Sequence, residues 1–235
     1  MAGQMIEFDA NGATAPGYLA TPDGTDAATG PGVLVLHAWW GLTEPFRQVC
    51  DRLAEAGYVA LAPDLYRGKA TASVEEAETL SSALNQEEER VRGDIRGAMR
   101  YLREHGAASP AGGSGAVGLI GFSMGGAYAL ATSVEASEEV AAVVLFYATY
   151  TGLDFATAQA AYLGHFAEND PFEPSESVEE LERELHAAGK QVTFYTYPGT
   201  THWFVEPNRA DAYDAAATAL AWERTLAFLN ATLRK

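Results

Sequence analysis

A serine between two glycines, in the sequence Gly121-Phe122-Ser123-Met124-Gly125, is a residue of this chain that could do covalent chemistry. The run 117–120 before it is apolar, and the small residues after it favour a helix. A serine in a sharp turn between a strand and a helix exposes its hydroxyl, and flanking glycines avoid collisions with neighbouring backbone. The pattern predicts that Ser123 is a nucleophile. The alternative is a glycine-rich turn that binds a phosphate or only reverses the chain.

A serine hydroxyl attacks poorly at neutral pH unless a base takes its proton, and that base is usually a histidine. The chain has five histidines. His202 follows the last predicted strand, in a loop where such a base is found. His105 and His186 lie in or near polar helical segments, and His165 lies inside a predicted strand. We predict His202 as the base, with a loop histidine bonded to backbone as the alternative, and we interpret His37 as a structural residue of its loop.

A carboxylate should fix the tautomer of that histidine and stabilise the imidazolium. On a strand–turn–helix framework the order along the chain is serine, acid, histidine. Asp170 lies between the two and follows a predicted strand, although Asp-Pro is also a common turn. Glu168 and Asp154 are less well placed competitors. Asp64 precedes the serine, and we interpret it as a structural hydrogen-bonding residue.

Acyl transfer also needs N–H donors for the negative oxygen of the tetrahedral intermediate. The backbone N–H of Met124, just after the serine, is the first predicted donor. Trp39 is the second, although the loop 37–42 offers several amides. Aromatic side chains in the same set of loops predict an apolar wall around an acyl or aromatic group, with ordinary packing as the alternative. They are Trp40, Tyr147, Trp203 and Phe204, together with Trp39.

These residues can act together only if the fold brings their loops to one edge. Apolar runs bounded by Gly and Pro alternate with helix-period segments, which is typical of an α/β fold with a mostly parallel sheet and helices on both faces. Ligands of such sheets bind at the carboxyl ends of the strands. Strands are predicted at residues 5–9, 17–20, 33–36, 58–62, 117–120, 140–148, 161–167 and 191–197. Helices are predicted at about 43–57, 73–84 and 91–102. A further helix is predicted directly after Ser123, and two more at 177–188 and 210–229. Loops are predicted to interrupt these elements at 23–32 and 106–115.

Length and charge narrow the classes of function. A chain of 235 residues with 48% hydrophobic residues is expected to form one domain, residues 1–235. Its net charge of −17 opposes binding to nucleic acid or to an anionic membrane, and the acidic residues are expected on solvated helix faces. The start of the sequence has no secretory pattern, which favours a cytoplasmic location. We expect a monomer or a small homo-oligomer.

Cys50 is the single cysteine, so the chain has no internal disulfide and no cysteine-based metal cluster. It shares helical spacing with Phe46, Leu53 and Ala54, which predicts a buried thiol. We expect neither a cofactor nor a metal.

Five groups of residues extend over nearly the whole chain. They are His37-x-Trp39-Trp40-Gly41-Leu42, Ala62-Pro63-Asp64-Leu65-Tyr66, Gly121-Phe122-Ser123-Met124-Gly125-Gly126, Gly164-His165-Phe166-Ala167-Glu168-x-Asp170, and His202-Trp203-Phe204 with Ala221-Trp222-x-Arg224-Thr225-Leu226-x-Phe228. Together and in this order they resemble the dienelactone hydrolase family of α/β-hydrolases. The resemblance implies an α/β-hydrolase fold and a hydrolase of carboxylic esters or lactones, whose partner is a small-molecule substrate.

Three positions depart from that family. Its well-known members carry a cysteine nucleophile and a glutamate that gates the thiol, where this chain has Ser123 and Ala38. These two differences agree, because a serine has no thiolate to gate. Dienelactone hydrolase itself holds a substrate carboxylate with arginines, one of them four residues after the histidine, where this chain has Glu206. The resemblance therefore implies a serine-dependent hydrolase that acts through an acyl-enzyme and prefers neutral substrates, unless Arg209 binds a carboxylate.

Two other functions stay open. The same fold could carry a non-hydrolytic acyl-transfer or cyclisation enzyme, which the departures at Ala38 and Glu206 make conceivable. It could also be a non-catalytic binding module, because a fold does not determine a function. The ordered set of Ser123, Asp170 and His202 favours the hydrolase.

Overall fold

The computed structural model describes residues 3–22, 30–105 and 115–234. They group into two compact units, Met1–Val117 and Gly118–Lys235. Neighbouring strands follow the order β1-β2-β4-β3 in the first unit and β5-β6-β7-β8 in the second. The single domain expected over 1–235 stays a prediction. The predicted breaks at 23–32 and 106–115 fall mostly outside the described residues.

The first unit begins with a hairpin. Strands β1 (Gln4–Ala10) and β2 (Ala13–Ala20) pair antiparallel around Asn11 and Gly12, which both have positive φ, as tight hairpin turns require. β2 is longer than the segment 17–20 predicted. β4 (Val59–Pro63) pairs antiparallel with β2 and parallel with β3 (Gly32–Leu36). Every residue of β3 and β4 is buried, as expected of strands covered on both faces.

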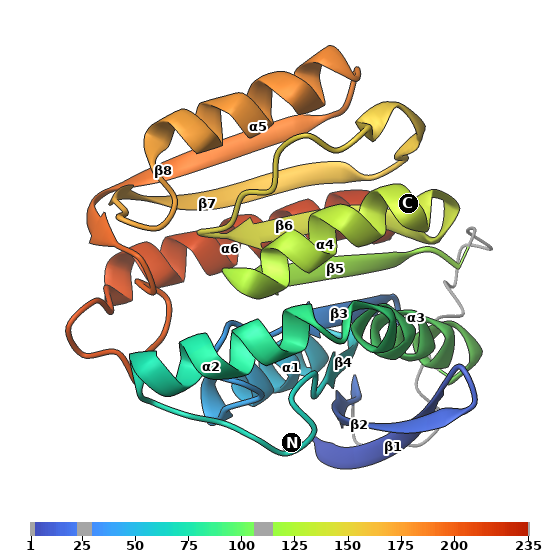
Figure 1. The fold of residues 1–235 in the computed structure, drawn as a ribbon. Helices are drawn as coiled ribbons and strands as arrows, with labels where there is room; N and C mark the ends of the chain where they lie inside the picture. The colour runs from blue at the N-terminus through green and yellow to red at the C-terminus, as the bar shows by residue number, and fades with distance from the viewer. Residues whose placement is uncertain (1–2, 23–29, 106–114, 235) are drawn as a thin grey trace. The chain divides into compact units, whose positions relative to one another are not determined.

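Three helices of the first unit have the predicted faces, but the third begins at Glu88, three residues before the predicted segment 91–102. In Figure 1, α3 (Glu88–His105) lies in front of the strands and α1 (Glu44–Glu55) behind them, and α2 (Val74–Asn85) precedes α3. Thr43 is the N-cap of α1 but its side chain makes no capping bond. Ser73 caps α2 by accepting from the Glu76 N–H at 3.5 Å. The apolar face of α3 is buried: Val91, Ile95, Met99 and Leu102.

Two interior features of the first unit are structural. The Cys50 side chain is fully buried on α1, and burial raises the pKa of its thiol, so the prediction of a core cysteine is confirmed. Asp94 on α3 is buried between two guanidinium groups, with Oδ1 2.6 Å from Arg67 Nη2 and Oδ2 2.8 Å from Arg90 Nη1. This charged cluster attaches α3 to the segment after β4, where Arg67 has a φ of 55°.

The second unit carries parallel strands between two helical layers. Strand β7 (Ala161–Asn169) pairs in parallel with both β6 (Val140–Phe146) and β8 (Val192–Thr201), and β5 (Val117–Phe122) precedes them. Figure 1 shows α4 (Met124–Glu135) and α5 (Ser175–Ala187) in front of these strands and α6 (Ala215–Leu233) behind them. Short 3₁₀ turns cover Ser137–Glu139 and Phe155–Thr157. The prediction of an α/β fold with a mostly parallel sheet is confirmed.

The predicted start of the last helix, at residue 210, is wrong. The α-helix begins at Ala215, because the carboxylate of Asp214 accepts a hydrogen bond from the Ala217 N–H at 2.8 Å and caps it there. Residues 210–213 form a turn instead. The loop that carries His202 is therefore longer than the sequence indicated.

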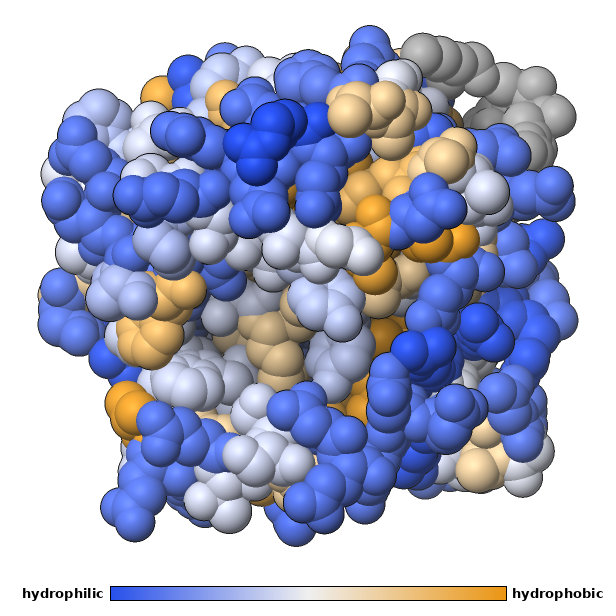
Figure 2. All heavy atoms as spheres, turned by 45° about the horizontal axis from the view of Figure 1, so that its top comes forward, coloured by the Kyte–Doolittle hydropathy of each residue, from blue (hydrophilic) through white to orange (hydrophobic). Residues whose placement is uncertain are grey.

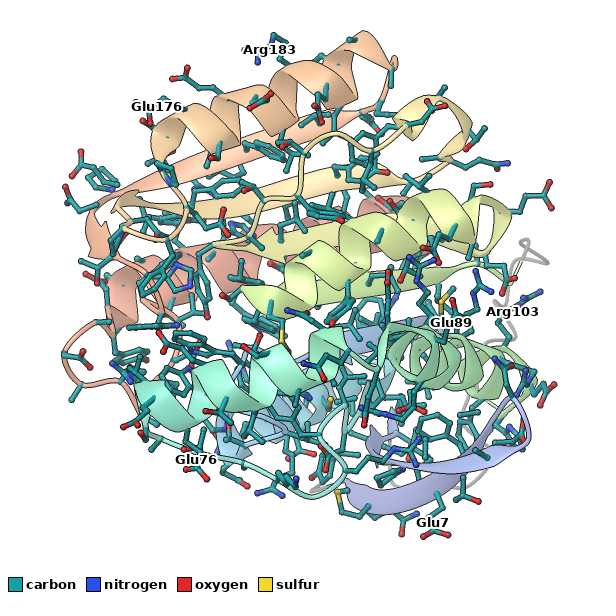
Figure 3. The ribbon with its side chains drawn as sticks, in the orientation of Figure 1. Glu7, Glu76, Glu89, Arg103, Glu176 and Arg183 are labelled. Carbon is teal, nitrogen blue, oxygen red and sulfur yellow. The ribbon has the colours of Figure 1, made fainter. Side chains whose placement is uncertain are left out.

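Acidic side chains cover the outside of the helices. Figure 3 shows Glu76 on α2, Glu89 on α3 and Glu176 on α5 pointing away from the strands, and all three residues are exposed. The face drawn in Figure 2 is mostly hydrophilic, with the largest apolar patch at its upper right. Among the described residues, no helix has the length and hydropathy that a membrane crossing requires.

Candidate active site

Ser123 occupies a strained turn between β5 and α4. Its φ of 48° and ψ of −118° are rare for a residue with a side chain. Its N–H donates to the Phe146 carbonyl at 3.0 Å, and its carbonyl accepts from the Gly126 N–H at 2.8 Å. A Cβ on Gly121 would lie 2.4 Å from Gly126 Cα, so the turn requires glycine there. The backbone thus holds a partly exposed serine at the start of a helix.

A hydrogen-bonded chain links this serine to a buried carboxylate. Ser123 Oγ lies 3.0 Å from His202 Nε2, and His202 Nδ1 lies 2.7 Å from Asp170 Oδ2 and 2.9 Å from Oδ1. The side chains of His202 and Asp170 are only 3% and 2% exposed. The carboxylate accepts the Nδ1–H, which leaves the Nε2 lone pair to accept the serine proton. The structure therefore brings together the three residues that the sequence analysis proposed as a triad.

Backbone donors hold Asp170 in place. Its Oδ1 accepts the N–H of Phe172 at 2.9 Å and that of Glu173 at 3.0 Å, in the turn that follows β7. The two competing acids have other partners. Glu168 Oε2 accepts the Gly199 N–H at 2.8 Å, and Asp154 Oδ1 accepts the Ala156 N–H at 3.1 Å. Asp170 thus both stabilises the turn after β7 and accepts the hydrogen bond from His202.

Aromatic rings surround the His202 imidazole. The ring centroids of Tyr147, Phe172 and Trp203 lie 4.6, 4.9 and 5.1 Å from that of His202. Phe204 packs on Tyr147 at 5.8 Å. Tyr147 and Phe204 are fully buried and Trp203 is 9% exposed, whereas Phe172 is 49% exposed. Sequence reasoning missed Phe172, although its place two residues after the predicted acid could have indicated it.

Tyr147 and Glu206 form a buried pair behind the histidine. The Tyr147 hydroxyl donates to Glu206 Oε1 at 2.8 Å, and neither residue is more than 1% exposed. Burial raises the pKa of the Tyr147 hydroxyl well above its ordinary range, and the Glu206 carboxylate adds to this shift. Tyr147 has a φ of 40° and donates its N–H to the His165 carbonyl at 2.8 Å. The pair connects the end of β6 to the loop that carries His202.

The Glu173 carboxyl lies close enough to Asp170 for the two charges to interact. The Thr149 hydroxyl donates to Glu173 Oε2, and Glu173 is partly buried. Burial raises the pKa of Glu173 to about 7, with the Thr149 hydrogen bonds opposing the shift and the Asp170 charge adding to it. A carboxyl group with a pKa near neutral therefore lies three residues after Asp170.

The remaining histidines and Asp64 have structural partners. His37 is buried, its Nδ1–H donates to the Ala38 carbonyl at 2.7 Å, and its Nε2 accepts from the Leu65 N–H at 3.2 Å. Asp64 accepts the N–H groups of Tyr66 and Gly68 at 3.1 and 2.7 Å. These bonds confirm the structural interpretation of His37 and Asp64, and burial lowers the pKa of the His37 imidazole.

His165 lies inside a directed hydrogen-bond network of the second unit. Thr225 donates its hydroxyl to the Ala221 carbonyl at 2.9 Å and accepts from His165 Nε2 at 3.0 Å. His165 Nδ1 then accepts from the Tyr197 hydroxyl at 2.8 Å, which accepts from Arg224 Nη1 at 3.2 Å. Burial, assisted by the Arg224 charge, lowers the pKa of His165 to about 3. A neutral His165 thus fastens β7 to β8 and α6.

The predicted oxyanion donors lie in different units. Met124 is the first residue of α4, directly after the serine, where helical N–H groups point out of the helix start. Trp39 and Trp40 follow β3 in the first unit, with ring centroids 5.2 Å apart. The Ala38 carbonyl accepts from Gly41 N–H at 3.2 Å and shapes this loop. The roles of these residues, and of the predicted wall of Trp40, Tyr147, Trp203 and Phe204, stay predictions.

The described side chains also show whether the protein has a candidate site for a metal ion. Within residues 3–22, 30–105 and 115–234, no group of three or more His, Cys, Asp or Glu side chains could hold a metal ion. The hydrogen bonds of Ser123, His202 and Asp170 make one connected group, with Glu173 and Glu206 nearby.

Comparisons with known proteins agree with this site. Residues 15–233 match the model of the dienelactone hydrolase family. A protein of Aquifex aeolicus, provisionally named a carboxymethylenebutenolidase, is 31% identical over 99% of this chain and 100% of its own. A Bradyrhizobium protein, provisionally named a 2-oxo-3-(5-oxofuran-2-ylidene)propanoate lactonase, is 30% identical over 96% of this chain and 92% of its own.

A solved structure extends the likeness to the fold. A protein of Klebsiella pneumoniae, provisionally described as a dienelactone hydrolase, superimposes with a TM-score of 0.80 at 25% identity, over 97% of this chain and 98% of its own. The α/β-hydrolase fold expected from the motifs is thereby confirmed. The chain belongs to the dienelactone hydrolase family and is a hydrolase that acts on ester or lactone bonds.

Proposed function

We propose that this protein hydrolyses carboxylic esters or lactones with Ser123 as nucleophile, through an acyl-enzyme. The observation that supports this most strongly is the continuous chain from Ser123 Oγ to His202 at 3.0 Å and from His202 to Asp170 at 2.7 Å. Nucleophile and base within hydrogen-bond distance, with a third group orienting the base, are the geometric signature of nucleophilic catalysis. The positive φ of Ser123 adds to this, because strained backbone is concentrated at functional sites.

The reaction would proceed in two halves. Ser123 Oγ attacks the carbonyl carbon while its proton moves to His202 Nε2, and the tetrahedral intermediate then expels the alcohol, which takes that proton. In the second half, His202 takes a proton from water, and the resulting attack on the acyl-enzyme releases the acid and restores the serine. Asp170 holds the imidazole in the Nδ1–H tautomer throughout. In this proposal the amide of Met124 stabilises the oxyanion.

The names of the relatives favour a cyclic ester. One is named for a carboxymethylenebutenolide and another for a furanylidene lactone. In a lactone, the alkoxide released by acylation stays attached to the acyl group, so the same two halves open the ring. A lactone or a simple ester is therefore the proposed substrate class. Both names describe compounds that carry a carboxylate. The preference for a neutral substrate that we propose for this chain rests instead on Glu206 and on the net charge of −17.

Replacing Ser123 tests the proposal directly. We expect Ser123→Ala to abolish covalent labelling by a fluorophosphonate and to lower kcat on p-nitrophenyl acetate by ~10⁴-fold, because the triad acts as a unit. Ser82→Ala, at an exposed position of α2, serves as the matched control and should label like the wild type. Mass spectrometry of the labelled peptide identifies the residue. Wild-type turnover in Ser123→Ala would overturn the assignment.

Two further measurements separate the alternative functions. A non-hydrolytic acyl-transfer enzyme would give a transferred ester, rather than free acid, when an alcohol acceptor is supplied. A binding module would neither label nor turn over. Ser123→Cys should be a weak hydrolase, because Ala38 stands where the cysteine-dependent relatives carry their gating glutamate. A variant as active as the wild type would show that this loop position does not matter.

A further inference from the structure

Phe172 is fixed beside the catalytic histidine with much of its ring open to solvent. Its centroid lies 4.9 Å from that of His202 and 5.2 Å from that of Trp203, and the residue is 49% exposed. Single exposed apolar side chains are ordinary on protein surfaces. This one is different because its N–H donates to Asp170 Oδ1 at 2.9 Å. The turn that places the triad acid therefore also places the ring.

The chemistry at His202 determines which part of a substrate meets this ring. Nε2 first takes the proton of Ser123 and then gives it to the oxygen of the departing alcohol. That oxygen must come within about 2.6–3.2 Å of Nε2 when the proton is transferred. The carbon group bound to the oxygen consequently passes along the edge of the imidazole. Phe172 lies against that imidazole, whereas the acyl group is held at Ser123 Oγ.

We propose that Phe172 forms a leaving-group subsite, which selects esters whose alcohol part is aromatic or bulky and apolar. The subsite rests on the proposed function, because it requires Ser123 and His202 to act as nucleophile and proton donor. In acylation the bond from Ser123 Oγ to the carbonyl carbon forms, the bond from that carbon to the alcohol oxygen breaks, and the serine proton passes through Nε2 to the alcohol. Phe172 offers its exposed face to the group that departs.

Two physical effects give this subsite its selectivity. An apolar group that covers the exposed face removes apolar surface from water on both partners. An aromatic group can also pack edge-to-face or offset on the ring, a geometry that adds to the attraction beyond the area buried. The Trp203 ring packs against the Phe172 ring, with their centroids 5.2 Å apart. Phe172 is therefore already held in place when the alcohol part of the substrate binds. We therefore expect a gain of ~5–10-fold in kcat/KM for an aromatic over a methyl alcohol part.

The test is a pair of substrate series. The first series varies the alcohol, with methyl acetate and benzyl acetate, and the second varies the acyl group, with methyl acetate and methyl phenylacetate. We expect Phe172→Ala to lower the benzyl-to-methyl ratio of kcat/KM by ~5–10-fold. The ratio for the acyl series should change less than about twofold, within the spread of ordinary surface substitutions. Phe172→Leu should keep part of the preference, because it keeps apolar surface.

Controls separate this inference from the proposed function. Leu220→Ala removes an apolar side chain of similar exposure, 41%, from α6, on the opposite face of the second unit from α4, and should change neither ratio. Fluorophosphonate labelling of every variant checks that the triad is assembled. A wild type that does not label at Ser123 would overturn the proposed function itself. Normal labelling with an unchanged alcohol ratio, or a change confined to the acyl series, would overturn the subsite alone.

Discussion

The Tyr147 hydroxyl joins two segments whose alignment positions His202, the proposed base. Its bond to Glu206 Oε1, 2.8 Å long and fully buried, joins the end of β6 to the loop after β8. The Tyr147 ring packs on the imidazole at 4.6 Å. Removing only the hydroxyl leaves a buried carboxylate short of one donor, which costs ~1–3 kcal/mol. Burying a polar pair costs more free energy than burying apolar side chains of the same size. Its place beside His202 therefore indicates that the pair positions the imidazole.

We predict that Tyr147→Phe lowers kcat about tenfold with little change in KM, because a displaced imidazole affects the chemical step more than binding. Stability should fall by ~1–3 kcal/mol in urea unfolding. Glu206→Gln keeps an acceptor for the phenol and should lose less activity than Tyr147→Phe. If Tyr147→Phe loses stability but keeps the wild-type kcat per labelled site, the pair only stabilises the fold.

Glu173 makes stability depend on pH in an unusual direction. Its pKa is raised from 4.5 to about 7 in the folded protein, so between these pH values the folded state binds more protons than the unfolded state. Stability contributed by this group is therefore complete below pH 4.5 and is lost as pH rises through 7. The buried His165, with its pKa lowered to about 3, acts oppositely, since its contribution is lost as pH falls below 6.5.

We predict that Glu173→Gln, which cannot ionise and still accepts from Thr149, gains stability relative to the wild type as pH rises. The difference should be small at pH 5 and reach about 1 kcal/mol at pH 8, after allowance for the partial exposure of Glu173. Urea unfolding of both proteins at pH 5, 6, 7 and 8 measures it. Subtracting the two curves cancels the His165 contribution. A difference that is independent of pH would show that Glu173 titrates normally.

At the scale of elements, the approach of α4 to the end of β6 fixes the geometry of the serine turn. Gly126, in the first turn of α4, leaves room for the Ala148 side chain, because a Cβ added to Gly126 would lie 2.2 Å from Ala148 Cβ. The same glycine donates its N–H to the Ser123 carbonyl. An outward shift of α4 would therefore move both the serine and the amide of Met124.

We predict that Gly126→Ala destabilises the protein by ~1–3 kcal/mol, as overpacking in a dense interior does, and lowers the rate of fluorophosphonate labelling. Ala148→Gly removes the colliding atom and should restore much of both losses in the double variant. The double-mutant cycle then gives a coupling energy of ~0.5–3 kcal/mol between the two positions. Additive losses would mean that the helix does not contact β6 through this pair.

The sequence predicted the elements better than the contacts between them. Glycine spacing indicated the turn at Ser123, because that signal is local. Strand ends, together with the order of serine, acid and histidine that this framework uses, predicted Asp170 and His202. The Asp214 cap is equally local, and overlooking it placed the last helix five residues early. The bond from Tyr147 to Glu206 spans 59 residues, and no periodicity or spacing in the sequence reports such a contact.

At the scale of the whole molecule, net charge sets which substrates approach easily. The charge of −17 gives the surface a negative potential that slows the association of anions, and salt screens it over ~10 Å at 0.1 M. Locally, Glu206 is engaged with Tyr147, and Arg209 lies over the Trp203 ring at 4.4 Å and bonds to Asp211 at 3.1 Å. The basic residue that could reverse a preference for neutral substrates already has partners.

We predict that kcat/KM favours a neutral lactone over its carboxylated analogue, and that raising salt from 0.02 to 0.5 M narrows the gap, because long-range repulsion is screened while local contacts are not. Glu206→Gln removes a local charge but keeps an acceptor for Tyr147. It should therefore reduce the difference in kcat/KM between the two lactones by a similar factor at low and high salt. Changing the salt concentration thus measures the effect of the whole surface charge, and Glu206→Gln measures the effect of the charge at the site. A wild-type preference for the carboxylated lactone that disappears in Arg209→Ala would instead mean that Arg209 leaves Trp203 to bind the anion, and that the site is built for a charged substrate.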